Sequence, residues 1–349
     1  MTAGDGGRPG TRRELRRQDG NTGRRGSLLA AEVSRLVSRR FVRWLVVLAL
    51  VGFVVSIGYA FTQFARPSAA GLAEATAQLK QVLIEADRSR AECAKTVPAD
   101  QTVETYCGPP AAEQGLTAEQ FIAKQPFELA RYAPIGAVAV ASGAAALAFL
   151  VGATFVGAEW STRSMVALLF WEPRRVRVMA VKIAVTAGFA LLVGALAQLL
   201  WAGAAVLLAR TRGTPKVTAG FWGDLLAQQG RSVALAVVAA LFGFGIATLI
   251  RGTGAALGVG FLYFALVETA VRSVWNAGQQ FLITINAEGL LVKGGTKVYL
   301  AYETVDERGI VQPGRELLIG NGRAGLTLAI YCGLLLAAGV WSFQRRDLQ

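Results

Sequence analysis

The sequence predicts an all-α membrane protein with six transmembrane helices, cytoplasmic N and C termini and an amphipathic elbow helix before the first span. Apolar residues make up 53% of the 349 residues and charged residues only 17%, where a soluble domain is about one quarter charged. Six segments are also apolar over roughly 20 residues, the length that crosses a bilayer. A soluble fold has no interior large enough for this apolar surplus, so lipid must surround part of the chain.

The six predicted spans share low charge and a length near that of a bilayer. They cover residues 42–62, 134–156, 178–208, 232–250, 253–271 and 324–343. The third is about 30 residues long, so it must tilt, bend near Gly188 or Gly194, or begin as an interfacial helix. Only Arg251 and Gly252 separate the fourth span from the fifth, which predicts a tight hairpin at one membrane face.

The distribution of charge predicts the orientation of these spans. One side, with residues 1–43, 158–182, Arg251 and the C-terminal end, carries nineteen Lys and Arg but seven acids; the other carries seventeen and fifteen. Lys and Arg near span ends mark the cytoplasmic side. Both termini are therefore expected inside, and residues 63–133 and 272–323 outside. Nucleic-acid binding, the alternative explanation of the net charge of +13, is disfavoured because the basic residues flank spans instead of forming one surface.

The N-terminal part divides into a tail and an elbow. Residues 1–26 are expected to be a disordered basic tail, and residues 27–349 a single transmembrane domain. Segment 28–40 begins an apolar stripe at helical spacing, formed by Leu29, Val33, Leu36, Val37, Phe41 and Trp44. The rest of its surface holds Glu32, Arg35, Arg39, Arg40 and Arg43. This pattern predicts an interfacial helix with its basic side toward anionic headgroups; a helix end with snorkelling arginines is the alternative.

The longest outer region, residues 63–133, is expected to hold two helices. The first has a stripe at helical spacing, formed by Leu72, Thr76, Leu79, Leu83 and Ala86. A capping box at residues 117–120 is expected to open the second. Cys93 and Cys107 lie between them and are expected to form a disulfide worth about 3 kcal/mol in the entropy model, with two free thiols as the alternative. In the other outer region, residues 293–309 predict a hairpin or an irregular cap.

Composition and motifs exclude several kinds of chemistry. The chain has no histidine, which rules out His-based acid–base catalysis and His metal ligands. Its three cysteines are too few for a cysteine-only zinc or iron–sulfur site. No G-x-x-x-x-G-K-[ST] motif occurs, so the chain cannot cradle ATP phosphates by itself. We therefore expect no catalytic, cofactor-binding or metal-binding residues and no enzyme activity on this chain.

Three features of the predicted spans concern their polar and small residues. Glu268 is the only acid well inside a span; it is a candidate intramembrane polar site, or it reaches interfacial water from near the outer end. Gly254 and Gly258 have the small-x-x-x-small spacing of a helix-packing face. Cys332, in the middle of the last span, is expected to be a small packing residue.

The segment 157–182 predicts a cytoplasmic amphipathic helix with a sharp end. One face is formed by Trp160, Ser164, Ala167, Leu168 and Trp171. Glu159 and Arg163 are placed for a favourable i,i+4 pair, and Pro173 stops the helix. Such a helix is suited to docking against a partner protein; a solvated loop that obeys the positive-inside rule is the alternative.

This segment resembles the cytoplasmic signature of type-2 ATP-binding-cassette (ABC) exporter permeases. The signature has an acid, a hydroxyl residue five positions later, a Leu-Leu pair, a proline, a basic residue and a later lysine. These positions hold Glu159, Ser164, Leu168, Leu169, Pro173, Arg175 and Lys182. The ending SFQRRDLQ is similar to the family's finish of an aromatic residue, two arginines and an acid. The chain differs in having Arg163 where the family commonly has glycine, and its proline comes one position later.

The resemblance implies the permease subunit of a bacterial export system in the plasma (inner) membrane. It would work with a second permease copy, identical or a sibling, and two cytoplasmic ABC ATP-binding subunits that hold Mg-ATP. The Ala-, Val-, Leu- and Gly-rich faces of the spans permit an amphipathic substrate, such as a lipid or a drug, but do not require one. The residues implied to couple the partner to the spans are Glu159, Trp160, Arg163, Ser164, Leu168, Leu169, Trp171, Pro173, Arg175 and Lys182. An ion-coupled secondary transporter and a non-transporting membrane scaffold are the alternatives.

Overall fold

The computed structural model describes residues 28–162, 164–165, 174–301, 304–305, 311–312 and 314–345. Each of the six predicted spans is confirmed as a helix long and apolar enough to cross a membrane. These helices are α3 (Arg40–Gln63), α6 (Leu129–Ser161), α8 (Arg175–Arg212), α9 (Phe221–Ile250), the run from α10 to α11 (Thr253–Val274) and α13 (Asn321–Arg345). The chain is therefore a mainly helical, multi-pass membrane protein.

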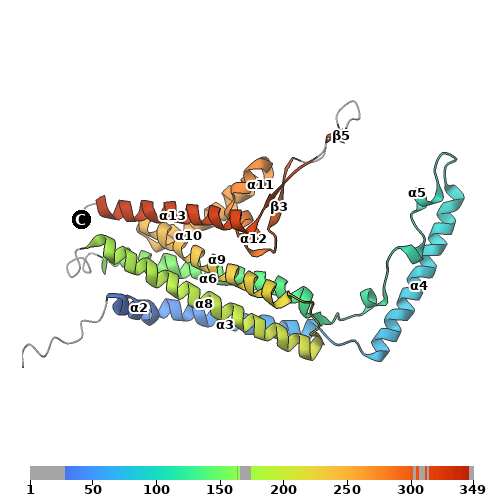
Figure 1. Cartoon of the computed structure of the whole chain (residues 1–349), viewed down its shortest axis with the longest axis horizontal. Coiled ribbons are helices and arrows are strands. Elements are labelled where there is room, and N and C mark those ends of the chain that lie inside the picture. The colour runs from blue at the N-terminus through green and yellow to red at the C-terminus, as the bar shows by residue number, and fades with distance from the viewer. Residues whose placement is uncertain are drawn as a thin grey trace, which may run out of the picture.

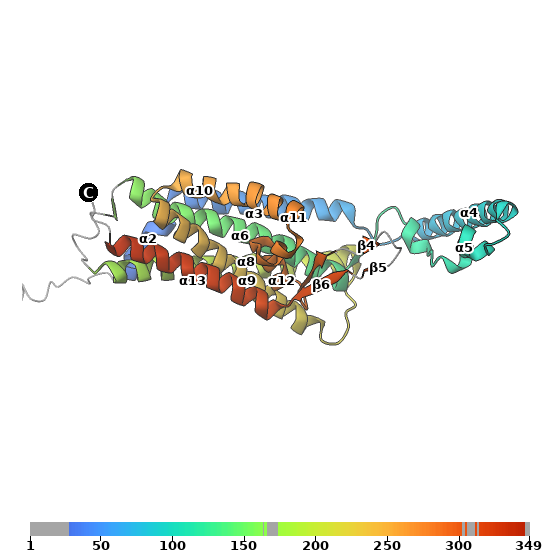
Figure 2. The ribbon, with the colours of Figure 1, turned by 90° about the horizontal axis from the view of Figure 1, so that it is seen from above.

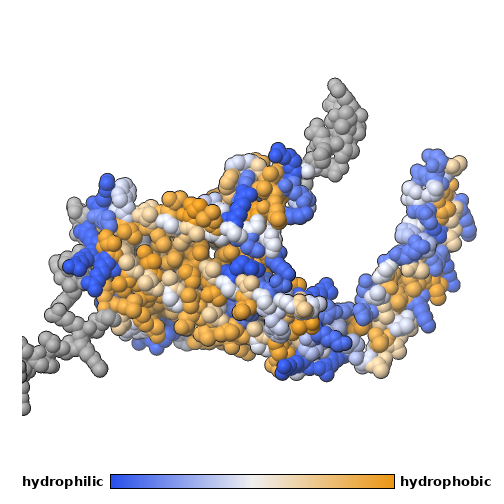
Figure 3. Space-filling view, in the orientation of Figure 1, coloured by the Kyte–Doolittle hydropathy of each residue, from blue (hydrophilic) through white to orange (hydrophobic). Residues whose placement is uncertain are grey.

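The helices form an elongated bundle with different structures at its two ends (Figure 1). One end, called the basic end, holds α2 (Leu28–Ser38), the last turns of α6 and α13 and the first turn of α8. The other, called the arm end, carries helix α4 (Ala69–Cys93) and the strands β3 (Thr296–Ala301) and β6 (Arg315–Ile319). Helix α4 projects away from the bundle in both views (Figures 1 and 2). Hydrophobic residues cover the visible face of the bundle between its ends (Figure 3), as a lipid-facing surface requires.

Helices α6 and α9 form the centre of the bundle, where their backbones come very close. A Cβ atom added at Gly152 of α6 would lie 2.0 Å from the carbonyl oxygen of Ala240 in α9. One added at Gly243 of α9 would lie 2.2 Å from the carbonyl oxygen of Phe149 in α6. Glycine allows membrane helices to approach at this distance. Helices α8, α10 and α13 pack around this pair.

Helix α8 is one uninterrupted helix of 38 residues. It neither ends nor breaks at Gly188 or Gly194, and the added Cβ of Gly194 would lie 3.2 Å from Ala236 of α9. At 1.5 Å per residue the helix is about 57 Å long, against about 30 Å for the hydrocarbon core. The long third span therefore stays helical throughout, and its length requires it to tilt, curve or extend beyond the membrane.

The predicted hairpin between the fourth and fifth spans is confirmed. Helix α9 ends at Ile250 and α10 (Thr253–Leu262) follows after two residues. Among the described residues, Arg251 is the one non-glycine with a positive φ, 60°, and this left-handed conformation closes α9. The fifth span continues through a π-helical segment, η4 (Tyr263–Glu268), into α11 (Thr269–Val274). A 3₁₀ helix, η5 (Asn276–Phe281), then leads to α12 (Ile283–Leu291), which packs against α9 and α13.

Short strands add to the predicted all-α fold at the arm end. Strand β3 pairs antiparallel with β6. The two strands form a hairpin, but its second strand lies after the predicted segment 293–309. Strand β4 (Thr304–Val305) pairs antiparallel with β5 (Val311–Gln312). Strand β1 (Phe127–Glu128) pairs parallel with β2 (Gly213–Thr214), which fastens the start of α6 to the end of α8.

The helix predicted from the stripe between Leu72 and Ala86 forms as α4. Ser68 caps it by accepting a hydrogen bond from the Gly71 N–H at 3.0 Å. The chain returns through η1 (Ala94–Thr96), α5 (Val103–Cys107), η2 (Ala111–Glu113) and η3 (Ala118–Phe121). The predicted capping box is wrong: η3 is a single turn, and the Thr117 side chain makes no capping bond. Short helices are marginal in water, and η3 packs against α4 as a single turn.

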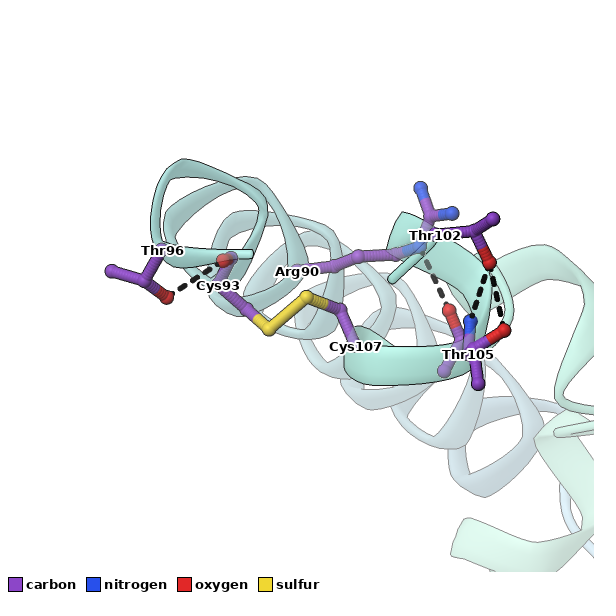
Figure 4. Close-up of a disulfide and its surroundings, with 7 residues drawn as sticks. Arg90, Cys93, Thr96, Thr102, Thr105 and Cys107 are labelled. Carbon is purple, nitrogen blue, oxygen red and sulfur yellow. Dashed lines mark hydrogen bonds between the residues drawn. A yellow bond between two sulfur atoms is a disulfide. The ribbon is translucent and has the colours of Figure 1, made fainter. Parts of the chain in front are cut away.

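The predicted disulfide between Cys93 and Cys107 is present (Figure 4). It joins the end of α4 to the end of α5, with 5.9 Å between the two Cα atoms. Beside it, Arg90 donates from Nε to the carbonyl oxygen of Gly108 at 3.0 Å. The bridge lies at the end of α4 that is far from the bundle. Cys332 is buried in α13, as a packing residue should be.

Candidate functional site at the basic end

Four segments meet at the basic end. Helices α2 and α3 are separated by Arg39, whose extended backbone (φ −65°, ψ 120°) breaks the helix between them. On either side of this break, Leu36 and Val42 are buried in an apolar cluster with Phe155 of α6 and Val185 of α8. This packing anchors the elbow to two spans and brings the charged side chains of α2 next to theirs.

Lys182 of α8 lies at the centre of these charged side chains. Its Nζ lies 2.6 Å from Oε2 of Glu32 in α2 and 2.7 Å from Oε2 of Glu159 in α6. The side chains of Lys182 and Glu32 are 0% exposed, and Glu159 is 5% exposed. One buried ammonium group therefore bridges two buried carboxylates from helices that are far apart in the sequence.

Two arginines extend this group toward the surface. Nη2 of Arg39 lies 3.0 Å from Oε1 of Glu159, and its Nη1 donates to the carbonyl oxygen of Thr154 at 3.0 Å. Nη1 of Arg35 lies 2.8 Å from Oε1 of Glu32. We call this set the charge cluster; its members are Arg35, Glu32, Lys182, Glu159 and Arg39.

The cluster is tolerated in the interior because every buried charge has a partner. Removing an ion from water costs several kcal/mol, which an opposite charge offsets only in good geometry. Each of the two carboxylates contacts two cations. The ring of Phe155 also lies 5.0 Å from Nζ of Lys182 and 5.2 Å from Cζ of Arg39, a cation–π distance. Buried ion pairs of this kind add little net stability, but they favour one relative position of the helices over others.

A second group of contacts holds α13 at the same end. The rings of Trp160 and Phe343 meet edge to face with centroids 5.7 Å apart, and Cζ of Arg251 lies 4.7 Å from the Trp160 centroid. Nη1 of Arg175 donates to the carbonyl oxygens of Phe343 and Gln344 at 3.3 and 3.2 Å. These bonds satisfy carbonyl groups that the end of α13 leaves free. These contacts join the ends of α6, α8 and α13 and the turn between α9 and α10 at the basic end.

Comparison of the chain with protein-family models, curated proteins and solved structures finds no match. The interpretation of the site therefore depends on its own geometry. Within the described residues, no three acids or cysteines gather in a way suited to a metal ion. The chemistry that the basic end offers is ionic pairing between helices.

Two of the predicted coupling residues are buried within the chain. Glu159 and Lys182 are 5% and 0% exposed and are paired with each other. Trp160 and Arg175 also make contacts within the chain, while Ser164 is exposed. The remaining predicted residues lie outside the described residues; they are Arg163, Leu168, Leu169, Trp171 and Pro173.

One residue of the elbow differs from its expected position. Glu32, assigned by its sequence pattern to the headgroup side, points into the bundle and is 0% exposed. Two signals predict this burial in hindsight. Glu32 lies four residues before the buried Leu36 and so shares its helical face. Lys182 is the single charge in the apolar run of the third span and needs a buried acid.

Glu268 has a structural partner near the arm end. Its Oε1 accepts the backbone N–H of Thr284 at 3.0 Å, and its Oε2 accepts the Thr284 hydroxyl. Nη2 of Arg272 lies 3.9 Å from Oε2. Glu268 is 4% exposed, so the alternative in which it reaches interfacial water is wrong. The carboxylate caps the first turn of α12.

Replacing Glu268 by Gln should leave the stability of the chain nearly unchanged, because the amide oxygen still accepts the Thr284 N–H. Glu268→Ala should lower the free energy of unfolding by about 1–3 kcal/mol, because a buried N–H loses its acceptor. Unfolding of the purified variants in one detergent, followed by tryptophan fluorescence, measures both. A Gln variant as unstable as the Ala variant would contradict the capping role and point to a requirement for the negative charge, as at an ion-binding site.

Proposed function

We propose that the chain is the permease subunit of an ABC export system that moves an amphipathic substrate, such as a lipid or a drug, across the plasma membrane. The observation that carries this proposal is the charge cluster, in which Lys182 ties α2 and α6 to α8. A partner that displaces α2 or the end of α6 would move α2, α6 and α8 together, because their charges are paired in the interior. Coupling to ATP requires a unit of this kind, whose two arrangements the partner contacts differently.

The basic end is proposed to face the cytoplasm. Exposed arginines surround the charge cluster, among them Arg40, Arg43 and Arg174. Arginine near span ends favours the inner side of a membrane. The disulfide at the arm end suits an oxidising exterior. Both features support an ATP-binding partner at the basic end.

The partner is proposed to contact the exposed residues beside the cluster. Ser164 and Arg174 are exposed there, and Val176 in the first turn of α8 is 56% exposed. The buried cluster then transmits the movement. In this division of labour the surface residues bind the partner, and Glu159 and Lys182 connect the helices.

A second permease copy is supported by α10. The sequence predicts a packing face at Gly254 and Gly258, yet an added Cβ atom at either position would meet no atom within 4 Å. The face is therefore open in the single chain. A helix of another copy could pack there, since small residues let membrane helices approach closely.

The proposal is tested by purifying the tagged full chain from its native membrane in mild detergent and identifying its companions by mass spectrometry. We expect an ABC ATP-binding subunit in equimolar amount. Val176→Glu should reduce its recovery about tenfold, which corresponds to about 1.4 kcal/mol of binding free energy. Val274→Glu is the matched control, because Val274 is 86% exposed at the end of α11, on the arm side. A chain that purifies alone from a complex shown to survive the detergent would contradict the proposal.

The ion-coupled alternative requires the buried charges to lie at a different depth in the membrane. Such carriers place charges or broken helices near the middle of the membrane. In the described spans, Glu159 and Lys182 lie near the basic end, and both are paired. Export that survives ATP depletion but stops when the ion gradient collapses would favour that alternative over the exporter.

A further inference from the structure

A cavity of about 1060 Å³ lies within the membrane-spanning part of the bundle. Its walls come from α6, α9, α10 with η4, and α13, and η5 and α12 close it toward the arm end. Phe261 and Leu334, which line it, are 71% and 67% exposed, so the cavity opens on the surface that the bilayer covers. Its volume is near the upper limit of pockets that hold small molecules.

The lining of the cavity has an apolar part and a polar part. Phe149, Phe242 and Ile246 belong to the apolar part, between the helices. Hydroxyl groups gather near the roof: that of Tyr263 accepts the Ile283 N–H at 3.3 Å, and that of Tyr331 donates to the Phe281 carbonyl oxygen at 3.2 Å. The Tyr331 hydroxyl can still accept hydrogen bonds, and the Tyr263 hydroxyl, which also contacts Glu268, keeps one acceptor lone pair for a ligand. The residues that line the cavity, all of them described, include no Asp, Glu, Lys or Arg.

The height of the cavity indicates what can fill it. On α9 the lining runs from Leu235 to Ile246, a rise of about 16 Å over eleven residue steps. The hydrocarbon core is about 30 Å thick, and a span of a second copy would need a groove of that length. The cavity is about half as high as the hydrocarbon core and is closed at one end by η5 and α12, so a molecule the size of a lipid fits it better than a transmembrane helix.

The backbone of the cavity wall is irregular at this place. Segment η4, which supplies Tyr263 and Phe264 to the lining, is π-helical. Such segments are rare and occur frequently at functional sites. One turn earlier, a Cβ atom added at Gly260 would lie 2.7 Å from Cζ of Phe149, so the cavity keeps its shape only with a residue as small as glycine there.

We propose that this cavity binds one lipid-like molecule, with an acyl chain in the apolar part and an uncharged hydrogen-bonding group beneath α12. The ligand enters sideways from the bilayer, past Phe261 and Leu334. This site goes beyond the export function, because it stands equally for a permease, an ion-coupled carrier or a scaffold.

The test uses the full chain in phosphatidylcholine vesicles that contain a small amount of a diacylglycerol with a diazirine in one acyl chain. After irradiation, labelled peptides are mapped by mass spectrometry. We expect label on cavity residues such as Phe149 and Phe242 to exceed label on Val51 and Val54 of α3 by about tenfold, the ratio for about 1.4 kcal/mol of preferential binding. Val51 and Val54 are 53% and 66% exposed and report contact with bulk lipid.

Filling the cavity should remove the preference. Ala146→Phe on α6 and Ala287→Phe on α12 each place a ring in the lining from a different wall, so one variant suffices if the other does not fold. Ala184→Phe on the exposed surface of α8 is the matched control and should keep the wild-type pattern. Equal labelling of the cavity and α3 in the wild-type chain would overturn the proposal. So would unchanged cavity labelling in a folded filling variant, or an unlabelled cavity beside a normally labelled α3, which would indicate a second copy there.

Discussion

Lys182→Met is expected to lower the free energy of unfolding by about 3–5 kcal/mol, the cost of removing one partner from a buried ion pair. Methionine keeps the length and most of the volume of the lysine stem, so the loss reports the missing charge and not a cavity. The carboxylates of Glu32 and Glu159 would lose their shared ammonium group while both stay buried. Unfolding of the purified chain in mixed micelles, titrated with denaturing detergent, measures the change.

Two further variants give this result its meaning. Lys293→Met removes an equally short contact, 2.6 Å to Asp224, but its two side chains are 74% and 52% exposed. Exposed pairs contribute at most about 1 kcal/mol, so this control should change little. Adding Glu32→Gln to Lys182→Met should recover part of the loss, because it removes a buried carboxylate that has lost its buried partner and keeps only the half-exposed Arg35. A Lys182 variant as stable as the Lys293 variant would show that the cluster does not hold the elbow to the spans.

Gly152→Ala is expected to destabilise the centre of the bundle by about 1–3 kcal/mol, in the range of overpacked cores. The new methyl group would lie 2.0 Å from the carbonyl oxygen of Ala240 and 2.8 Å from its carbonyl carbon. These are backbone atoms, which cannot rotate away as a side chain can, so α6 and α9 must separate. The same unfolding titration measures the effect, and Gly243→Ala should act in the same direction from the other helix.

Gly143→Ala is the matched control for this prediction. Gly143 lies in the same helix, α6, but no atom lies within 4 Å of its added Cβ. Alanine favours a helix over glycine by about 1 kcal/mol, so this variant should be neutral or slightly stabilising. If both alanine variants were equally stable, the close contact of α6 and α9 would not be a determinant of the fold.

Local sequence patterns predict the secondary structure of this chain well. Each of the six spans is an apolar run of bilayer length, and such a run forms a helix because lipid offers no other partner for its backbone. The hairpin at Arg251 follows from the shortness of the connection between two spans. Cys93 and Cys107 lie in the same connection between two spans, 14 positions apart, and form the predicted disulfide. The capping box at residues 117–120 does not produce a longer helix, because capping residues alone do not stabilise a short helix.

The candidate site was predictable only in part. Sequence patterns mark Glu159 and Lys182, but as a surface for a partner, because amphipathic spacing shows which residues share a face and not what that face contacts. Arg39 carries the same charge as the exposed arginines around it, and Glu32 is a single acid among them. Nothing local separates a headgroup contact from an ion pair that spans more than a hundred positions of the chain.

Composition and periodicity are therefore sufficient for the membrane location and the helices, because the free energy of placing each segment in lipid is nearly a sum over its own residues. Tertiary structure alone assigned Lys182 to Glu32 and Glu159, brought Gly152 against Ala240, and formed the cavity between α10 and α13. These features depend on which helices become neighbours. Pairing and packing energies between distant segments decide that, and no window of the sequence contains them.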